Sequence, residues 1–424
     1  MKNFERYYKA VAFLEGLSNL PIEGDYMIKR GDLDVYLKKM RSFLEKLDNP
    51  DKYIKFIHIT GTAGKGTVTN MIHEVLNVSG ANVGSFTSPF VTTSLEKIKV
   101  RDLYISPDEF ADIVDYLKPH INEEYQDSPY GRPSYFELFL AIALVYFKNK
   151  KCEWVVLEVG CGGRYDATNV IKNPIITAIT NIDYDHMNIF GNTLKQIAYE
   201  KVGIIKRGSF FYTTEKRKHL LKMFRDVCEE NKVKLNVIYA KGNYSLQNIA
   251  LVKAITHKLG INEEDIQRGI KQAHLQCRFE IMQNNPLVIL DGAHNRVKIK
   301  STLENLRKLK FNKLHIIIGM ADNKDGDSML KQIIPIVDSV IVTRFQIKDR
   351  KCAHPKRLLT KVREYLRKGT LSELSLDPEV ALDRTIERAA KNDLILVTGS
   401  FFLVGELRKR WFSEESILSR RKSF

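Results

Sequence analysis

Short apolar runs alternate with longer amphipathic segments along most of the chain. The runs are rich in β-branched residues and are bounded by Gly, Pro or Asn, which is typical of buried strands. In the first half they cover residues 55–60, 82–88, 154–160 and 175–182, and helices are predicted at about 66–78, 107–117, 135–147 and 193–206. Strands that alternate with helices predict an α/β fold built on a doubly wound parallel sheet.

The same alternation begins again after about Cys277. Four more apolar runs, at residues 288–292, 314–320, 339–345 and 394–400, predict a second and smaller α/β domain of the Rossmann type. We expect the hinge near Gln276–Phe279, so the predicted domains are residues 1–277 and 278–424. A chain of 424 residues is long enough for two such domains.

The cysteines and the longest apolar run indicate the compartment. Five cysteines are scattered without a C-x-x-C pair, which argues against a disulfide framework or a zinc knuckle. The longest uncharged apolar run, Leu138–Phe147, is too short to span a bilayer. The first ten residues lack the apolar region of a signal peptide. We therefore expect a cytoplasmic protein with no membrane partner.

The chain is basic, with 67 Lys and Arg against 51 Asp and Glu and a formal net charge of +16. Such an excess can serve nucleic-acid binding, since phosphates need a cationic surface. It can also attract a small anionic substrate, or it can be a bias toward lysine without a specific partner, because the charges are dispersed. Charge alone leaves these three interpretations open.

The residues TGTAGKGT at 60–67 form the strongest local motif. They follow an apolar strand and open a helix, which is the setting of a phosphate-binding loop. Glycines let backbone N–H groups approach phosphate oxygens, and the helix N-terminus adds partial positive charge. Lys65 would reach the β- and γ-phosphates, and the Thr67 hydroxyl would bind magnesium. The alternative is a Gly-rich turn without a ligand, since Gly66 interrupts the strict G-x-x-x-x-G-K-[ST] spacing.

Polar residues also follow other predicted strands, at the edge where open parallel sheets bind ligands. Glu158 ends one strand and is a candidate magnesium ligand, because a carboxylate oxygen suits a hard cation. His186 follows the next strand, and Asp291 and His294 follow a strand of the second domain. Each residue alone could be structural, but their repetition at strand ends favours a site.

Two cations stand out by their position. Lys201 lies among apolar neighbours on a predicted helix, where an ammonium is costly to bury. Alternatively, its stem could lie along the surface while its charge reaches water. Arg278 falls at the expected hinge and could reach phosphates there, although an isolated Arg is ordinarily surface charge.

These motifs, in this order, resemble the folylpolyglutamate synthase and dihydrofolate synthase branch of the Mur ligase family. The resemblance extends from about Tyr7 to Arg410 and rests on the segments HITGTAGKGT, EVGCGGRYDATN, NIDYDHMNIFGNTLKQIAYEKVGIIK, LDGAHN and VTGSFFLVGEL. It implies an N-terminal P-loop-type ATPase domain with a parallel sheet, a C-terminal Rossmann-like glutamate-ligase domain, and an active site in the cleft between them.

The resemblance also implies roles for individual residues. The nucleotide-binding residues would be Gly61, Thr62, Gly64, Lys65, Gly66, Thr67, Asn248, Arg278 and Asp291. The ligands of two magnesium ions would be Thr67, Ser88, Glu158 and His186. The substrate residues would be Phe136, Asp166, Ala167, His294 and Ser400. The catalytic residues would be Lys65, Lys201 and His294, with Lys201 carried as a carbamate formed from CO2.

Four positions depart from the family's usual motifs. The phosphate loop has Ala63 where Asn is usual and Thr67 where Ser is usual. Phe90 replaces the His of a TSPHL segment, and Ser245 replaces a Gln near the expected adenine contact. These changes bear on substrate affinity and pterin preference rather than on the ligase chemistry.

The implied reaction is ATP-dependent amide formation. The carboxylate of dihydropteroate or of a tetrahydrofolate attacks the γ-phosphate to give an acyl phosphate and ADP, and the amine of L-glutamate then displaces phosphate. We expect a monomer without a nucleic-acid partner, whose basic excess attracts these anionic substrates. The alternatives are a Mur-type ligase acting on a non-folate acid and a nucleic-acid-binding P-loop ATPase.

Overall fold

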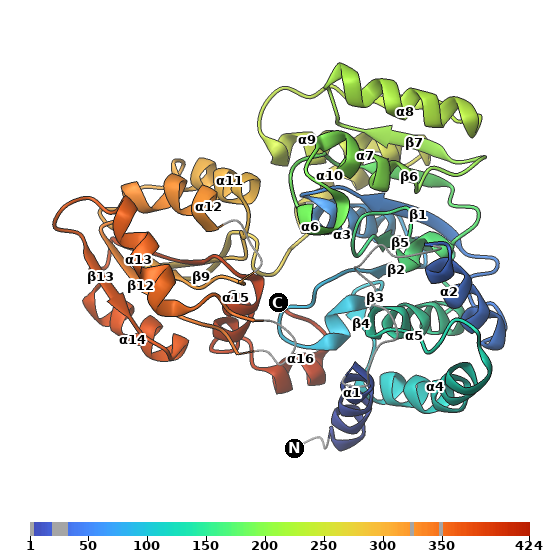
Figure 1. Cartoon of the computed structure of the whole chain (residues 1–424), viewed down its shortest axis with the longest axis horizontal. Coiled ribbons are helices and arrows are strands. Elements are labelled where there is room, and N and C mark those ends of the chain that lie inside the picture. Colours follow the sequence, from blue (N-terminus) through green and yellow to red (C-terminus); the bar gives the residue numbers. More distant parts are fainter. Residues whose placement is uncertain (1–3, 19–32, 323–325, 347–350) are drawn as a thin grey trace. The chain divides into compact units, whose positions relative to one another are not determined.

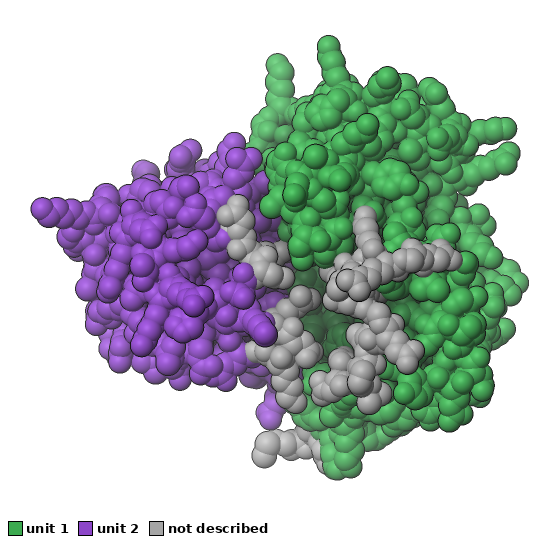
Figure 2. All heavy atoms as spheres, viewed as in Figure 1, with its two compact units in different colours: residues 1–90, 94–274, 418–422 green, residues 91–93, 275–417, 423–424 purple. Residues whose placement is uncertain are grey.

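The computed structural model describes residues 4–18, 33–322, 326–346 and 351–424 (Figure 1). The chain forms two compact units (Figure 2). Unit 1 contains Met1–Phe90, Ser94–His274 and Leu418–Lys422, and unit 2 contains Val91–Thr93, Leu275–Ile417 and Ser423–Phe424. Each unit has its own sheet and its own core.

Unit 1 contains an eight-stranded sheet in the order β4-β3-β2-β5-β1-β6-β7-β8. The six strands from β2 to β8 in this order run parallel, and β3 and β4 extend one edge in antiparallel fashion. The strands are β1 Lys55–Thr60, β2 Val83–Phe86, β3 Ile98–Val100, β4 Leu103–Tyr104, β5 Trp154–Glu158, β6 Ile176–Ile179, β7 Phe210–Thr213 and β8 Leu235–Val237.

Helices cover both faces of this sheet, which explains why its central strands are apolar on both sides. Ile57 and Ile59 of β1 pack into a core with residues of α3, α9 and α10. A second core joins β6 and β7 to α7 and α8 on the other face, where α5 also packs against β2. The helices are α1 Glu5–Ser18, α2 Val35–Lys46, α3 Lys65–Val78, α4 Pro107–Asp127, α5 Tyr135–Asn149, α6 Met187–Phe190, α7 Leu194–Val202, α8 Lys218–Glu230, α9 Tyr244–Lys258 and α10 Glu263–Gln272, with 3-10 turns η1 Ser94–Lys97 and η2 Ala167–Val170.

Unit 2 contains a six-stranded sheet in the order β13-β12-β11-β14-β10-β9, parallel except for β9 at one edge. Successive residues of β14 alternate between two cores, one beneath α11, α12 and α13 and the other beneath α14 and α15. The elements are β9 Glu280–Asn284, β10 Leu287–Asp291, α11 Arg296–Leu306, β11 Leu314–Ile318, α12 Gly326–Ile333, η3 Ile334–Ile336, β12 Ser339–Val342, α13 Pro355–Tyr365, β13 Leu371–Leu374, α14 Pro378–Arg388, β14 Leu394–Thr398, α15 Phe401–Arg408 and α16 Glu414–Arg420.

The predicted α/β fold class is confirmed, and all eight predicted strands are present. Six further strands were not predicted. The edge strands β9 and β13 are short and carry polar residues, and β3 and β4 span only three and two residues. Because β3, β4 and β9 pair in antiparallel fashion, the sheets are mixed rather than purely parallel. Within the described part of the chain, the helices are too short or too polar to cross a membrane.

A buried ion pair crosses the interior of unit 2. The guanidinium of Arg408, which is fully buried, donates to both carboxylate oxygens of Glu280 at 2.8–3.1 Å. It also donates to the carbonyl oxygen of Ser423 and lies over the rings of Phe412 and Phe424. This bidentate pair joins α15 to the edge strand β9.

Replacing Arg408 by Met should destabilise unit 2 by about 3–5 kcal/mol, because the Glu280 carboxylate would stay buried without its cation. Urea unfolding followed by tryptophan fluorescence measures the change, in a Trp154→Phe background so that Trp411 of unit 2 is the remaining tryptophan. The matched control is Arg388→Met, whose partner Glu373 is 2.7 Å away but whose side chain is 48% exposed, so its loss should cost at most about 1 kcal/mol. Equal effects of the two variants would contradict this account.

Candidate active site

The phosphate loop, residues 61–64, is held in shape by the segment that follows β6. The N–H groups of Thr62 and Ala63 donate to the backbone and side-chain oxygens of Asn181, at 2.9 and 2.8 Å. The Thr180 hydroxyl donates to the Ala63 carbonyl oxygen at 2.6 Å. The strands β1 and β6 are neighbours, so their carboxyl ends bring these two loops together.

Two glycines of the loop have no room for a side chain. A Cβ atom on Gly61 would lie 1.8 Å from the Thr180 hydroxyl oxygen, and φ is 152°. A Cβ atom on Gly64, where φ is 83°, would lie 2.7 Å from the amide nitrogen of Asn248. The structure thus places Asn248, which belongs to α9, directly against the phosphate loop.

Two lysines converge on the same backbone oxygen. The ammonium groups of Lys65 and Lys201 both donate to the carbonyl oxygen of Gly61, at 3.2 and 3.1 Å. Lys201 lies in the last turn of α7, a helix that begins with a reciprocal cap between Thr193 and Gln196. Only 5% of Lys201 is exposed, so the alternative in which its charge reaches water is wrong.

Burial, followed by the positive charge of Lys65, lowers the pKa of Lys201 to about 8. Near this pH about half of the Lys201 side chains are neutral amines. A neutral amine is a nucleophile, so Lys201 can react with a small electrophile under mildly basic conditions.

A buried carboxylate lies at the N-terminus of α3. Glu158 ends β5, is 5% exposed, and accepts the N–H of Ser88 at 3.1 Å. Its carboxylate lies 3.2 Å from the position that a Cβ on Gly66 would occupy. Thr67 is the next residue of the helix. The structure therefore gathers the predicted oxygen ligands Ser88 and Glu158 beside the phosphate loop.

The described residues contain no cluster of three or more His, Cys, Asp or Glu side chains that could hold a metal ion. A divalent ion beside Glu158 would therefore depend on one carboxylate, hydroxyl oxygens, water and phosphate. This donor set suits magnesium, which is commonly bound through one or two carboxylates and the substrate phosphates.

His186 follows β6 and is the N-cap residue immediately before the short helix α6, with a left-handed φ of 51°. Its ring lies 6.0 Å from that of Phe190, and the Lys201 ammonium lies 6.0 Å from the same Phe190 ring. The Asp185 carboxylate is 4.0 Å from His186 Nε2. The structure thus places His186 and Lys201 against the same phenylalanine.

The predicted acceptor residues form a second group in unit 1. A Cβ on Gly160 would lie 2.6 Å from the Phe136 ring and 3.2 Å from the Asp166 carboxylate, so both side chains adjoin this glycine. Asp166 is buried and accepts the N–H groups of Cys161 and Thr168, and burial raises the pKa of its carboxyl. Ala167 follows Asp166 and is buried at the start of η2.

The predicted residues of unit 2 gather at the carboxyl ends of β10 and β14. Asp291 accepts from Ala293 N–H and from the Thr302 hydroxyl; burial raises its pKa, and the charge of Arg278 opposes that shift. The guanidinium of Arg278 lies over the Phe401 ring, 4.7 Å from its centroid. The backbone N–H of Gly399 donates to the Ala293 carbonyl oxygen, which joins the two loops.

His294 and Ser400 lie on these two loops. His294 Nδ1 is 2.9 Å from the Gly292 carbonyl oxygen, and Nε2 is 2.9 Å from the Lys298 ammonium. An ammonium donates only, so Nε2 accepts and Nδ1 carries the proton. The Ser400 side chain is buried and caps α15 by accepting the N–H of Phe402.

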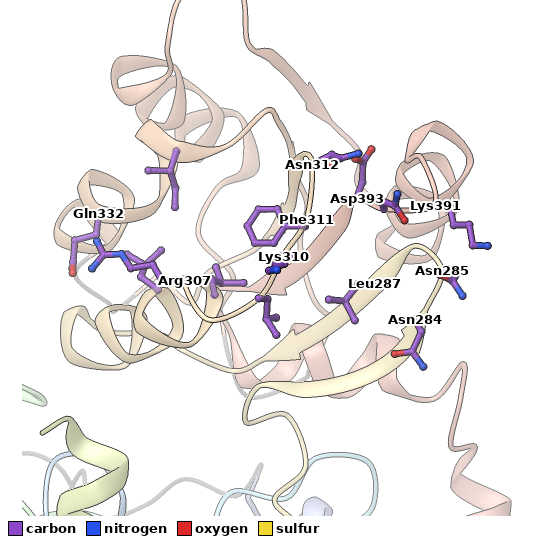
Figure 3. Close-up of a pocket in the computed structure, with 15 residues that line it drawn as sticks. Asn284, Asn285, Leu287, Arg307, Lys310, Phe311, Asn312, Gln332, Lys391 and Asp393 are labelled. Carbon is purple, nitrogen blue, oxygen red and sulfur yellow. The ribbon is translucent and has the colours of Figure 1, made fainter.

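A cavity of about 880 Å³ in unit 2 lies at the amino ends of the strands, away from the carboxyl ends that carry Asp291, His294 and Ser400 (Figure 3). Its lining includes Leu287 and Asp393, which lie at the amino ends of β10 and β14, together with Arg307, Phe311 and Gln332. None of the predicted site residues lines this cavity.

Sequence reasoning did not single out three residues that shape these groups. Thr180 anchors the phosphate loop, Lys298 fixes the tautomer of His294, and His58 bonds to Thr168. The spacing of four between His294 and Lys298 was an available signal, since residues i and i+4 meet on a helix. For His58, the available signal was its position as a polar residue within the apolar strand KFIHIT.

Comparison with known proteins identifies both halves of the chain. Residues 59–271 match the Mur ligase middle domain, and residues 277–401 match the Mur ligase, glutamate ligase domain. The dihydrofolate synthase/folylpolyglutamate synthase of Bacillus subtilis (strain 168) is 30% identical over 414 residues, covering 88% of this chain and 94% of the relative.

Solved structures agree over nearly the whole length. A folylpolyglutamate synthase from Thermotoga maritima is 31% identical with a TM-score of 0.80, covering 96% of this chain and 97% of that one. A bifunctional folylpolyglutamate synthase/dihydrofolate synthase with Mn, AMPPNP and L-glutamate bound is 26% identical with a TM-score of 0.80, covering 95% and 97%.

Replacing Gly61 by Ala should weaken ADP binding at least tenfold, because the new methyl group would overlap the Thr180 hydroxyl and displace the loop. Isothermal titration with ADP measures the affinity. Gly80→Ala is the control, since Gly80 also has a positive φ, of 91°, but nothing lies within 4 Å of a Cβ there. Wild-type affinity in Gly61→Ala would show that the loop does not hold the nucleotide.

Proposed function

The chain belongs to the Mur ligase family, in its branch of folylpolyglutamate and dihydrofolate synthases, and on that premise we propose how its residues carry out the reaction. The protein is an ATP-dependent ligase that joins L-glutamate to a folate-type carboxylate. The structural observation that supports this function best is the convergence of Lys65, Lys201 and Glu158 on the phosphate loop.

We propose that the phosphate loop binds ATP through Gly61, Thr62, Gly64, Lys65, Gly66 and Thr67. The open N-terminus of α3 supplies N–H donors and partial positive charge. Lys65 leaves the Gly61 carbonyl oxygen to neutralise the phosphate that is transferred. Asn248, Arg278 and Asp291 contact the rest of the nucleotide, and Asn248 already adjoins the loop.

Two magnesium sites are proposed at the same loop. Thr67, Ser88 and Glu158 would hold one ion, and His186 would contribute to the second. The oxygen donors beside Glu158 fit magnesium, and a related solved structure contains Mn together with a nucleotide analogue. When bound, the ions offset the repulsion between the acceptor carboxylate and the phosphates.

Lys201 is proposed to be carbamylated. The ammonium first loses one proton to give the neutral amine. The amine then adds to the carbon of CO2, which forms a C–N bond and releases a second proton, so a buried cation becomes an anion. The lowered pKa makes the amine available, and burial shields the product from water. The Lys201 carbamate would then attract the Lys65 ammonium and orient the residues of the second proposed magnesium site, to which His186 contributes.

The acceptor is proposed to lie against Phe136, Asp166 and Ala167, and L-glutamate against His294 and Ser400. The acceptor carboxylate attacks the γ-phosphate, which gives an acyl phosphate and ADP. The glutamate amine then attacks the acyl carbon, and phosphate leaves. His294, whose Nε2 accepts from Lys298, is proposed to bind glutamate or to relay a proton during the second step.

We also propose a cytoplasmic monomer that binds no nucleic acid. All five cysteines are free thiols, as expected in a reducing compartment. The basic excess is used in attracting ATP, folates and glutamate tails.

A single assay tests the function. Phosphate release with ATP, Mg2+ and L-glutamate should depend on an acceptor, and comparison of dihydropteroate with tetrahydrofolate shows which synthase activity is present. Lys65→Ala should lower turnover at least 100-fold, because a charge aimed at the transferred phosphate is worth on the order of 3 kcal/mol. Turnover stimulated by DNA or RNA, or confined to a non-folate acid, would refute the folate assignment.

Lys201→Ala should be nearly inactive and should recover partly in acetate or formate, since a small carboxylate can replace the carbamate anion. Lys201→Arg should show no recovery, because its cation fills the space and is not carbamylated. In wild type, 13C NMR with 13CO2 should show a carbamate whose occupancy rises as pH increases through about 8, as the amine loses its proton. Full activity of Lys201→Ala without added carboxylate would rule out the carbamate.

A further inference from the structure

A chain of buried hydrogen bonds runs from the middle of β1 to Asp166. His58 Nε2 lies 2.8 Å from the Thr168 hydroxyl oxygen, which lies 2.5 Å from Asp166 Oδ1. The three residues are between 0% and 3% exposed. His58 precedes the phosphate loop by three positions, so one strand contacts both the loop and the proposed acceptor residues.

The hydrogen-bond partners of Asp166 determine which atom is the donor in each of these two hydrogen bonds. Asp166 accepts the backbone N–H of Thr168 at Oδ1 and that of Cys161 at Oδ2. A backbone N–H can only donate, so both oxygens are acceptors, and these bonds favour the carboxylate against the burial that raises its pKa. The Thr168 hydroxyl therefore donates its only proton to Asp166, and its oxygen accepts a hydrogen bond from His58. It follows that His58 carries its proton on Nε2.

His58 is a neutral ring in the working pH range. Burial, assisted by the charge of Lys206, lowers its pKa to about 3. Its other nitrogen, Nδ1, has no hydrogen-bond partner in the described part of the chain. The ring is therefore held by a single hydrogen bond, and that bond is directed at Thr168.

We propose that His58 is a positioning residue for the acceptor. Its Nε2–H stops rotation of the Thr168 hydroxyl, and the hydroxyl in turn keeps the Asp166 carboxylate beside Phe136. This inference deepens the proposed function and rests on it, because Asp166 and Phe136 are the proposed acceptor contacts. His58 itself does not touch the substrate.

Steady-state kinetics of matched variants test the role. His58→Leu and Thr168→Val each remove one donor and should raise the KM for the acceptor roughly tenfold, with the KM for ATP unchanged within twofold. The double variant should be no worse than either single variant, since both break the same chain. His58→Gln can place an amide N–H near the position of Nε2 and should restore much of the acceptor KM.

Other kinetic patterns would overturn the proposal. Equal rises in the KM for ATP, glutamate and acceptor, or additive effects in the double variant, would assign His58 a merely structural role. An unchanged acceptor KM in His58→Leu would show that the hydrogen bonds from His58 to Asp166 do not contribute to acceptor binding.

NMR of 15N-histidine-labelled wild-type protein provides a readout that needs no turnover. The resonance missing from His58→Gln should show the Nε2–H tautomer and should not titrate between pH 5.5 and 8.5. An Nδ1–H tautomer, or titration near pH 6.5, would overturn the hydrogen-bond chain. Wild-type protein inactive with both folate acceptors would instead refute the proposed function and the acceptor role together, while the NMR result would still report on the chain.

Discussion

The phosphate loop of unit 1 depends on one constraint: two lysine ammonium groups share a single backbone carbonyl oxygen. Lys65 and Lys201 both donate to Gly61, in surroundings where water does not screen them fully. Burial first, and then the positive charge of Lys65, lowers the pKa of Lys201 to about 8, and the loss of its proton removes the repulsion. While both groups are charged, the same arrangement favours an anion such as a phosphate that binds between them.

The sheet geometry determines which residues reach that point. β1, β5 and β6 are adjacent and parallel, so the phosphate loop, Glu158 and the segment from Thr180 to His186 all emerge at one edge. In unit 2, β10 and β14 do the same for Asp291, His294 and Ser400. Each unit therefore carries its own group of polar residues at strand ends, while the helices on both faces of each sheet supply stability.

Much of this could be predicted from the sequence, because strand ends are readable from apolar runs and parallel strands share an edge. The positions of the phosphate loop, Glu158 and Asp291 at the ends of β1, β5 and β10 were predicted in this way. The partners of these residues could not be found, since they depend on contacts between distant segments: Lys201 and Gly61 are separated by 140 positions. Short polar edge strands such as β13 also escaped, because their LSEL sequence lacks the apolar run that marks a buried strand.

The bonds that Thr180 and Asn181 make to the phosphate loop have a thermodynamic consequence. They fix the loop through the protein's own groups, so the backbone entropy of ordering is lost during folding rather than during association. A nucleotide that binds to such a preordered loop loses less of its interaction energy to ordering, so its affinity is higher. Folding stability and ligand affinity are therefore linked at this loop. A substitution that removes the hydrogen bonds of Thr180 or Asn181 would leave the loop to be ordered when the nucleotide binds, and the affinity would fall by that entropy cost.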